Sequence, residues 1–278
     1  MSGTLELKKV FIPGVCAAAL LLSACGGGSS SSTTVRDETP PPEDTSSGRD
    51  DFSGQGVKDY FVGPDATPEA GVFLGEVTYT NETPAVEGMM FLSPTGNFSF
   101  ILGADSITSG TLTFDGTNVV GTAVEYELFD KWFRSPGALT STAVSNESAT
   151  FDPSGIVDEF TITRDSVASD QTLTFDQIQG LYKTTAGAEP QITVDVDGGI
   201  NGVDRGCILK GQITIPVPAI NVYELNYEAS GCNAVGEVTG SQRDGEYLGV
   251  GTFNPADAGG IEFGASNGKI ASFFTGTR

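Results

Sequence analysis

Apolar and polar residues alternate along most of the chain after residue 51. Tyr223, Leu225 and Tyr227 are separated by polar residues, and so are Phe98 and Phe100 in the first half. A period of two is typical of strands with one buried face. Turn-forming Asp-Gly, Asn-Gly and Pro-x-Gly sequences interrupt these runs at short intervals. The pattern predicts an all-β protein of antiparallel hairpins.

Helical periodicity is confined to short stretches at residues 56–61 and 175–179. A polar segment at residues 165–177 predicts a seam, which divides the sequence into an N-terminal β domain at 52–167 and a C-terminal β domain at 168–278. Two small antiparallel β-barrel or sandwich modules fit this pattern best. A single larger barrel or sandwich is the alternative.

The first 51 residues have a different composition. Lys8 and Lys9 precede an apolar stretch at residues 10–22. This stretch is too short to cross a hydrocarbon core of about 30 Å as a helix, so residues 1–24 are predicted to be a secretory signal peptide. Residues 25–51 are rich in Gly, Ser, Pro and acidic residues and are predicted to form a disordered tether.

The end of the apolar stretch reads Leu22-Ser23-Ala24-Cys25. This tetrapeptide resembles the lipobox of bacterial lipoproteins. The resemblance implies that Cys25 carries a diacylglycerol and that its amine is acylated, with palmitate for example. Because Gly and not Asp follows the cysteine, it also implies an outer-membrane anchor, with the periplasmic or surface face left open. An ordinary signal peptide with a chance cysteine is the alternative.

Two cysteines are left once Cys16 departs with the signal and Cys25 is acylated. In an oxidising compartment Cys207 and Cys232 are expected to form a disulfide. Closing a loop of this size contributes about 3–3.5 kcal/mol in the chain-entropy model.

The same cysteines belong to a second resemblance. The Gly206-Cys207 pair, the Asn221-x-Tyr223 sequence and Cys232 are similar to the C-terminal module of little-characterised proteobacterial β-rich lipoproteins. That resemblance implies a β-rich fold and an envelope location, and it implies no activity.

Charge and composition exclude several function classes. The net charge is -22 and the chain has no histidine. Serine or cysteine nucleophiles activated by histidine and histidine metal sites are therefore excluded. Nucleic-acid binding is not expected, because phosphate contact needs a basic surface. With no carboxylate pair standing out among the acidic residues, we expect an acidic surface coat and no enzymatic activity.

One acidic segment superficially resembles a calcium loop. Asp195, Asp197 and Asp204 supply the oxygen ligands that calcium prefers. However, Gly206 stands where an EF-hand loop needs a carboxylate. The alternative is a strand end followed by a β-turn whose glycines adopt positive φ. We therefore expect no cofactor apart from the lipid, with calcium as a weak candidate.

The densest aromatic cluster contains Phe129, Trp132, Phe133 and Arg134. Aromatic residues beside arginine are typical of binding hot spots, so the cluster is a candidate interaction patch. Packing inside the end of a barrel is the alternative.

These observations lead to one functional hypothesis and two rivals. We expect an outer-membrane-anchored lipoprotein acting as a non-catalytic binding or envelope-structural module, for example in adhesion, a surface complex or assembly. Its partners would be the membrane, through the anchor, and another envelope protein or a surface polymer. The rivals are a β-barrel lipoprotein that captures a small ligand or nutrient and a histidine-free carboxylate hydrolase. A closed barrel with a large apolar cavity would favour the ligand carrier, whereas filled interiors would favour a scaffold or adhesin.

Overall fold

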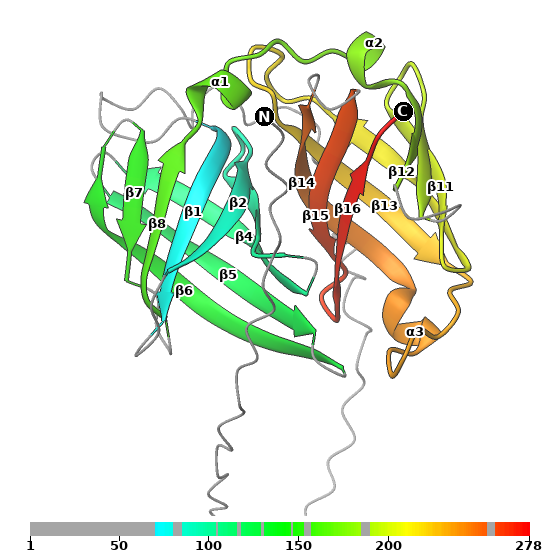
Figure 1. The fold of residues 1–278 in the computed structure, drawn as a ribbon, viewed down its shortest axis with the longest axis horizontal. Coiled ribbons are helices and arrows are strands. Elements are labelled where there is room, and N and C mark those ends of the chain that lie inside the picture. The colour runs from blue at the N-terminus through cyan, green and yellow to red at the C-terminus, as the bar shows by residue number, and fades with distance from the viewer. Residues whose placement is uncertain are drawn as a thin grey trace, which may run out of the picture. The chain divides into compact units, whose positions relative to one another are not determined.

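The computed structural model describes residues 70–79, 85–103, 105–115, 118–128, 131–145, 147–152, 157–184, 190–254 and 259–278. These residues form two eight-stranded antiparallel sheets, which confirms the predicted all-β fold with two modules (Figure 1). The predicted signal peptide, Cys25 and the predicted tether lie outside the described residues. No helix in the described part of the chain is long and apolar enough to cross a membrane.

The first sheet is a closed barrel in which β1 pairs with both β2 and β8. Its strands are β1 Gly71–Tyr79, β2 Val86–Leu92, β3 Asn97–Ile101, β4 Ser106–Asp115, β5 Asn118–Leu128, β6 Trp132–Val144, β7 Ser148–Phe151 and β8 Val157–Arg164. Alternate residues of these strands, such as Phe98 and Phe100, are buried in one core. The period-two pattern of the sequence therefore places the core inside the barrel.

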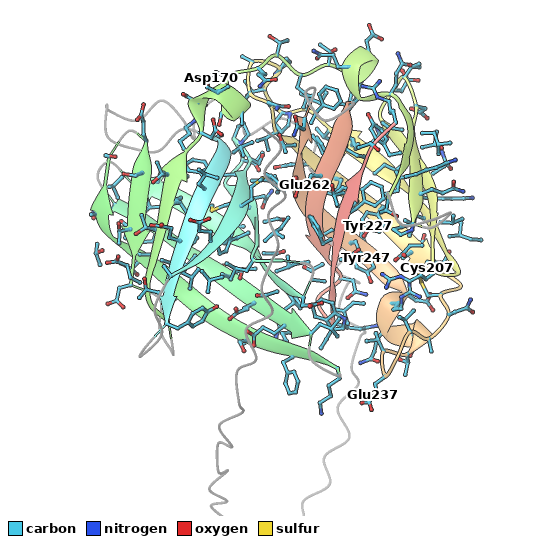
Figure 2. All side chains as sticks on the ribbon, viewed as in Figure 1. Asp170, Cys207, Tyr227, Glu237, Tyr247 and Glu262 are labelled. Atoms are coloured by element: carbon cyan, nitrogen blue, oxygen red, sulfur yellow. A yellow bond between two sulfur atoms is a disulfide. The ribbon has the colours of Figure 1, made fainter. Side chains whose placement is uncertain are left out.

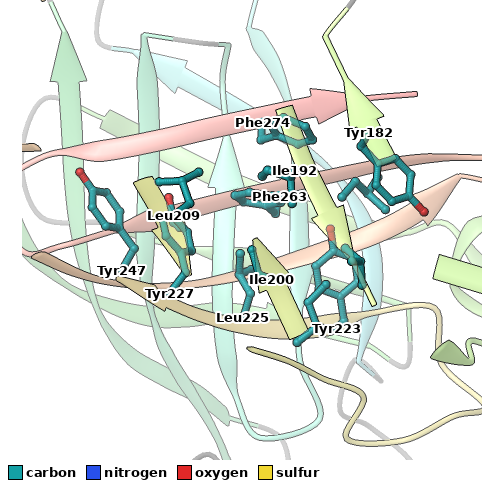
Figure 3. Close-up of a cluster of buried hydrophobic side chains, with 14 of the residues drawn as sticks. Tyr182, Ile192, Ile200, Leu209, Tyr223, Leu225, Tyr227, Tyr247, Phe263 and Phe274 are labelled. Atoms are coloured by element: carbon teal, nitrogen blue, oxygen red, sulfur yellow. The ribbon is translucent and has the colours of Figure 1, made fainter. Parts of the chain in front are cut away.

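The second sheet follows the same up-and-down order. Its strands are β9 Gly180–Lys183, β10 Gln191–Val194, β11 Gly199–Asp204, β12 Cys207–Thr214, β13 Tyr223–Ser230, β14 Gly245–Asn254, β15 Gly260–Ser266 and β16 Ala271–Gly276. The two edge strands meet at one end, where Lys183 and Thr277 exchange two backbone hydrogen bonds of 3.0 Å. Tyr223, Leu225 and Tyr227 point into the core of this sheet, as predicted (Figure 3).

Short helices occupy the connections. The segment between the sheets runs from residue 165 to residue 179 and holds α1 Ser166–Ser169 and α2 Phe175–Ile178. The sequence predicted α2, whereas α1 and α3 Gly240–Arg243 were not predicted. The side chain of Asp165 caps α1 by accepting the backbone N–H of Ala168.

The two sheets pack against each other within one compact unit. An apolar cluster joins Val72 and Ile101 of the first sheet to Val250 of the second and to Val222, which directly precedes β13. Next to it, Ser99 Oγ donates a 2.8 Å hydrogen bond to the carbonyl of Gly264. A Cβ atom on that glycine would lie 3.1 Å from the Ser99 Cβ, so the missing side chain allows the close approach.

A buried carboxylate adds specificity to this contact. Glu224 lies on the outer face of β13, and its Oε1 accepts hydrogen bonds from Ser93 Oγ at 2.6 Å and Asn97 Nδ2 at 3.1 Å, and also from Thr95 Oγ1. The hydrogen bonds tie the β2–β3 turn to the second sheet. Alternation alone predicts that Glu224 faces solvent; it is buried because the first sheet covers this face.

Candidate ligand-binding cavity

The interior of the second sheet is not completely filled by side chains. A cavity of about 380 Å³ lies towards the end that carries α3, between β10, β12, β13, β14, β15 and β16. Cavities that hold small molecules commonly measure about 300–1,000 Å³. The space is therefore large enough for one small organic ligand.

Aromatic rings form much of the wall. Tyr227 and Tyr247 are cross-strand partners and stack with ring centroids 4.9 Å apart and an interplanar angle of 3°. Phe263 and Phe274 stack on the neighbouring strands with centroids 5.3 Å apart. Figure 3 shows both pairs inside the sheet, with Leu209 beside Tyr227. Such walls suit a flat apolar ligand, because offset rings and apolar faces pack well together.

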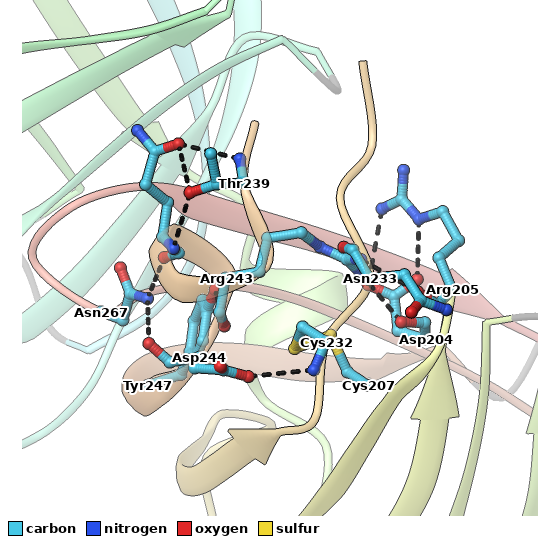
Figure 4. The surroundings of a disulfide bond; sticks show 11 residues. Asp204, Arg205, Cys207, Cys232, Asn233, Thr239, Arg243, Asp244, Tyr247 and Asn267 are labelled. Carbon is cyan, nitrogen blue, oxygen red and sulfur yellow. Dashed lines mark hydrogen bonds and ion pairs between the residues drawn. A yellow bond between two sulfur atoms is a disulfide. The ribbon is translucent and has the colours of Figure 1, made fainter. Parts of the chain in front are cut away.

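The polar end of the cavity is built around Arg243 of α3. Its buried guanidinium donates to the carbonyls of Asn233 at 2.7 Å, Arg205 at 2.9 Å and Asp204 at 2.8 Å, and it pairs with Asp204 Oδ2 at 3.1 Å. Figure 4 shows this network beside the disulfide. The positive charge is therefore compensated by the protein itself.

The two stacked tyrosines are neutral. Burial is the main cause that raises the pKa of both phenols above their ordinary value of 10.0. The neighbouring Tyr247 raises the pKa of Tyr227 further, whereas Arg243 opposes the increase at Tyr247. The Tyr247 hydroxyl donates to the Arg243 carbonyl at 3.0 Å. The cavity thus combines an aromatic wall and neutral phenol groups with charged side chains such as Asp105 and Glu237.

The β5–β6 hairpin contributes part of the cavity lining. Leu128 and Trp132 line the cavity, although both belong to strands of the first sheet. The next residue, Phe133, has 44% of its surface exposed, and Arg134 is also exposed. Successive residues of a strand point to opposite sides, so the structure separates the residues of the predicted interaction patch. Phe129, the fourth residue of that patch, lies outside the described residues.

A disulfide joins Cys207 and Cys232, as predicted. Cys207 lines the cavity, and the loop after Cys232 contributes Val235 and Val238 to the lining. Asp244 Oδ1 accepts the backbone N–H of Cys232 at 3.0 Å. Figure 2 shows Cys207, Tyr227 and Tyr247 in the second sheet, and Glu237 of the same loop at the sheet's lower end. The disulfide therefore holds one wall of the cavity to β12.

In the segment that was a weak calcium candidate, the carboxylates of Asp195 and Asp204 have partners within the protein. Asp195 Oδ1 accepts the backbone N–H groups of Asp197 at 2.9 Å and Gly199 at 2.7 Å. Gly198 in this turn has a φ of 83°. Asp204 instead pairs with Arg205 and Arg243. Within the described residues there is no group of three or more His, Cys, Asp or Glu side chains placed to share a metal ion.

The residues that line the cavity could not be recognised as one group from the sequence. Tyr227 and Tyr247 belong to the regular alternation of β13 and β14, and nothing in the sequence shows that they stack beside an open space. Arg243 is followed by an Asp-Gly turn and gives no sign that it is buried. The packing of the whole sheet decides where a core remains unfilled.

Fold and cavity define an all-β protein with two sheets, the second of which contains a space of about 380 Å³. No protein-family model matches the chain, and no curated protein sequence matches it either. Among solved structures, the chain is similar to Aeromonas veronii immune modulator A, with a TM-score of 0.39 and 12% sequence identity. The match covers 78% of this chain and 96% of that protein. At this TM-score the likeness supports no argument about function.

Proposed function

We propose that the protein is a non-catalytic binding protein of the cell envelope that holds a small aromatic molecule in the cavity of its second sheet. The observation that carries the proposal is a space of about 380 Å³ lined by stacked aromatic rings. Ligand sites commonly combine apolar walls with convergent polar groups, and this cavity sets its aromatic wall beside the charged side chains of Asp105, Arg205 and Glu237.

The charges around the cavity indicate the class of ligand. The buried Arg243 guanidinium is compensated by Asp204 and by backbone carbonyls, so it does not require an anionic ligand. The Tyr247 hydroxyl already donates its proton to the Arg243 carbonyl, so towards a ligand it can only accept a hydrogen bond, for example from a hydroxyl group. The ligand that fits best is an uncharged aromatic compound with one or two oxygen atoms.

Filling the cavity tests this proposal. Ala229 is buried and lines the space, so Ala229→Leu adds a larger side chain there. We expect the variant to bind the apolar probe N-phenyl-1-naphthylamine at least tenfold more weakly than the parent protein. Ile208, with 52% of its surface exposed on the same sheet, provides the control Ile208→Ser, which should bind normally. Equal binding by all three proteins would rule out the cavity as the site.

The location in the envelope is a separate part of the proposal. It rests on the sequence Leu22-Ser23-Ala24-Cys25, which would be acylated at the cysteine and held in the outer membrane. Several acyl chains give stable membrane attachment. Cys25→Ala should move the protein from the membrane fraction to the soluble fraction, whereas unchanged fractionation would contradict the anchor.

A second candidate function is binding of another envelope protein or a surface polymer through the β5–β6 hairpin. The exposed ring of Phe133, with the Lys131 ammonium 5.3 Å from its centroid, favours it. A photocrosslinking residue at position 133 should give a discrete adduct in intact cells, and one at position 208 should not. Identical crosslinking patterns at positions 133 and 208 would rule out partner binding through the β5–β6 hairpin.

A further inference from the structure

A second cavity lies inside the first barrel, separate from the ligand cavity described above. Its volume is about 130 Å³, and aromatic side chains contribute much of its lining: Tyr79, Phe98, Phe100 and Phe160. The rings of Phe100 and Phe160 lie 4.8 Å apart between centroids. An engineered protein cavity of about 150 Å³ holds a benzene molecule, so this one accommodates a single small organic group.

The lining also contains a carboxylate. Glu125 lies on β5 two residues after Ala123, so both side chains belong to the inner face of the barrel, and both line the cavity. Burial raises the pKa of the Glu125 carboxyl, the nearby Glu127 carboxylate raises it further, and the neighbouring Ser106 hydroxyl opposes the increase. None of the ion pairs among the described residues includes Glu125. An acidic group that is costly to ionise therefore faces an aromatic space without a protein cation beside it.

The lining favours an organic cation over a metal ion. A hard metal ion needs several oxygen ligands. Glu125 supplies the carboxylate of this lining. The other side-chain oxygens belong to Thr108, Ser135 and Tyr79, and most of the remaining lining groups are apolar. In contrast, the faces of aromatic rings attract alkylated ammonium groups, whose methyl groups also pack against apolar walls.

We propose that the first barrel binds a small organic ammonium group, such as a methylated amine, between the aromatic rings and the Glu125 carboxylate. The cation would pair with Glu125 and reduce its repulsion with Glu127. This site involves neither the residues nor the ligand class of the cavity in the second sheet, so either site can be present without the other.

Choline and its neutral isostere 3,3-dimethylbutan-1-ol test the proposal, because they have similar shapes and differ in charge. Calorimetric titration of the mature chain should show that choline binds at least tenfold more tightly than the alcohol. Glu125→Gln should abolish this preference. Glu159→Gln, which changes an exposed acid of β8 in the same barrel, should retain it.

A second variant separates the role of the rings from that of the carboxylate. Phe100→Leu removes a ring and leaves Glu125, so we expect choline affinity to fall severalfold while the alcohol binds nearly as before. Far-UV circular dichroism confirms that each variant is folded. Equal affinity of the parent protein for the two ligands, absence of choline binding, or full choline affinity in Glu125→Gln would overturn the proposal.

Discussion

Removal of the disulfide should lower the stability of the protein by an amount that the sequence separation sets. Cys207 and Cys232 are 25 residues apart. Closing a loop of this length in the unfolded chain corresponds to about 3.5 kcal/mol in the chain-entropy model. We therefore expect the double variant Cys207→Ser/Cys232→Ser to lose about 3.5 kcal/mol of unfolding free energy.

The folded state should survive this change, because the loop has other attachments. Arg243 Nη1 donates to the Asn233 carbonyl at 2.7 Å, and Asp244 accepts the Cys232 N–H. Val235 and Val238 also form a short bridge within the loop. The effect should thus arise mainly in the unfolded chain, with little change in the native circular dichroism spectrum.

Equilibrium unfolding in urea, followed by circular dichroism, measures the difference. Adding a thiol reductant to the parent protein should reproduce the stability of the double variant, and the variant itself should not respond to reductant. A loss below about 1 kcal/mol would show that the disulfide constrains the unfolded chain much less than loop closure requires.

Two further substitutions test the contact between α1 and the first barrel, and the buried acid. Ser169→Ala should lower the unfolding free energy measured in urea by about 1–3 kcal/mol, because the buried Val72 N–H loses its hydroxyl acceptor at 2.9 Å. The control Ser145→Ala changes an exposed serine and should lower it little. A loss of unfolding free energy near zero in Ser169→Ala would contradict the hydrogen bond from the Val72 N–H to Ser169. Because the pKa of Glu125 is raised above 4.5, the folded state binds this proton more tightly than the unfolded chain, and stability falls as pH rises from 4.5 through the folded pKa. In urea titrations, Glu125→Gln should therefore be more stable than the parent protein at pH 7, and the difference should shrink towards pH 4.5. A variant less stable than the parent at pH 7 would contradict the raised pKa of Glu125.

Most of the fold could be predicted from local sequence because the two sheets follow the simplest order. Each strand pairs with its neighbour in the sequence, so alternation and turn residues are enough to place the hairpins. The buried side chains of Ile192 and Val194 show the expected alternation with the exposed Thr193. Cys207 and Cys232 were paired correctly because the expected export and acylation left two cysteines.

The candidate site depends on contacts between distant strands, and local patterns do not encode them. Trp132 and Phe133 are adjacent in sequence, yet one lines a cavity with the second sheet and the other is exposed. Glu125 occupies an inward position of β5, where alternation alone would favour an apolar residue. Neither feature can be recognised until the strands are placed in three dimensions.

The central claim is that the second sheet encloses a ligand, and intermolecular nuclear Overhauser effects test it most directly. In a complex with N-phenyl-1-naphthylamine, we predict contacts from probe protons to the rings of Tyr227 and Phe263 and to the methyl groups of Leu209, all of which line the cavity. Contacts confined to exposed side chains of the sheet, such as Ile208 and Leu248, would contradict the account.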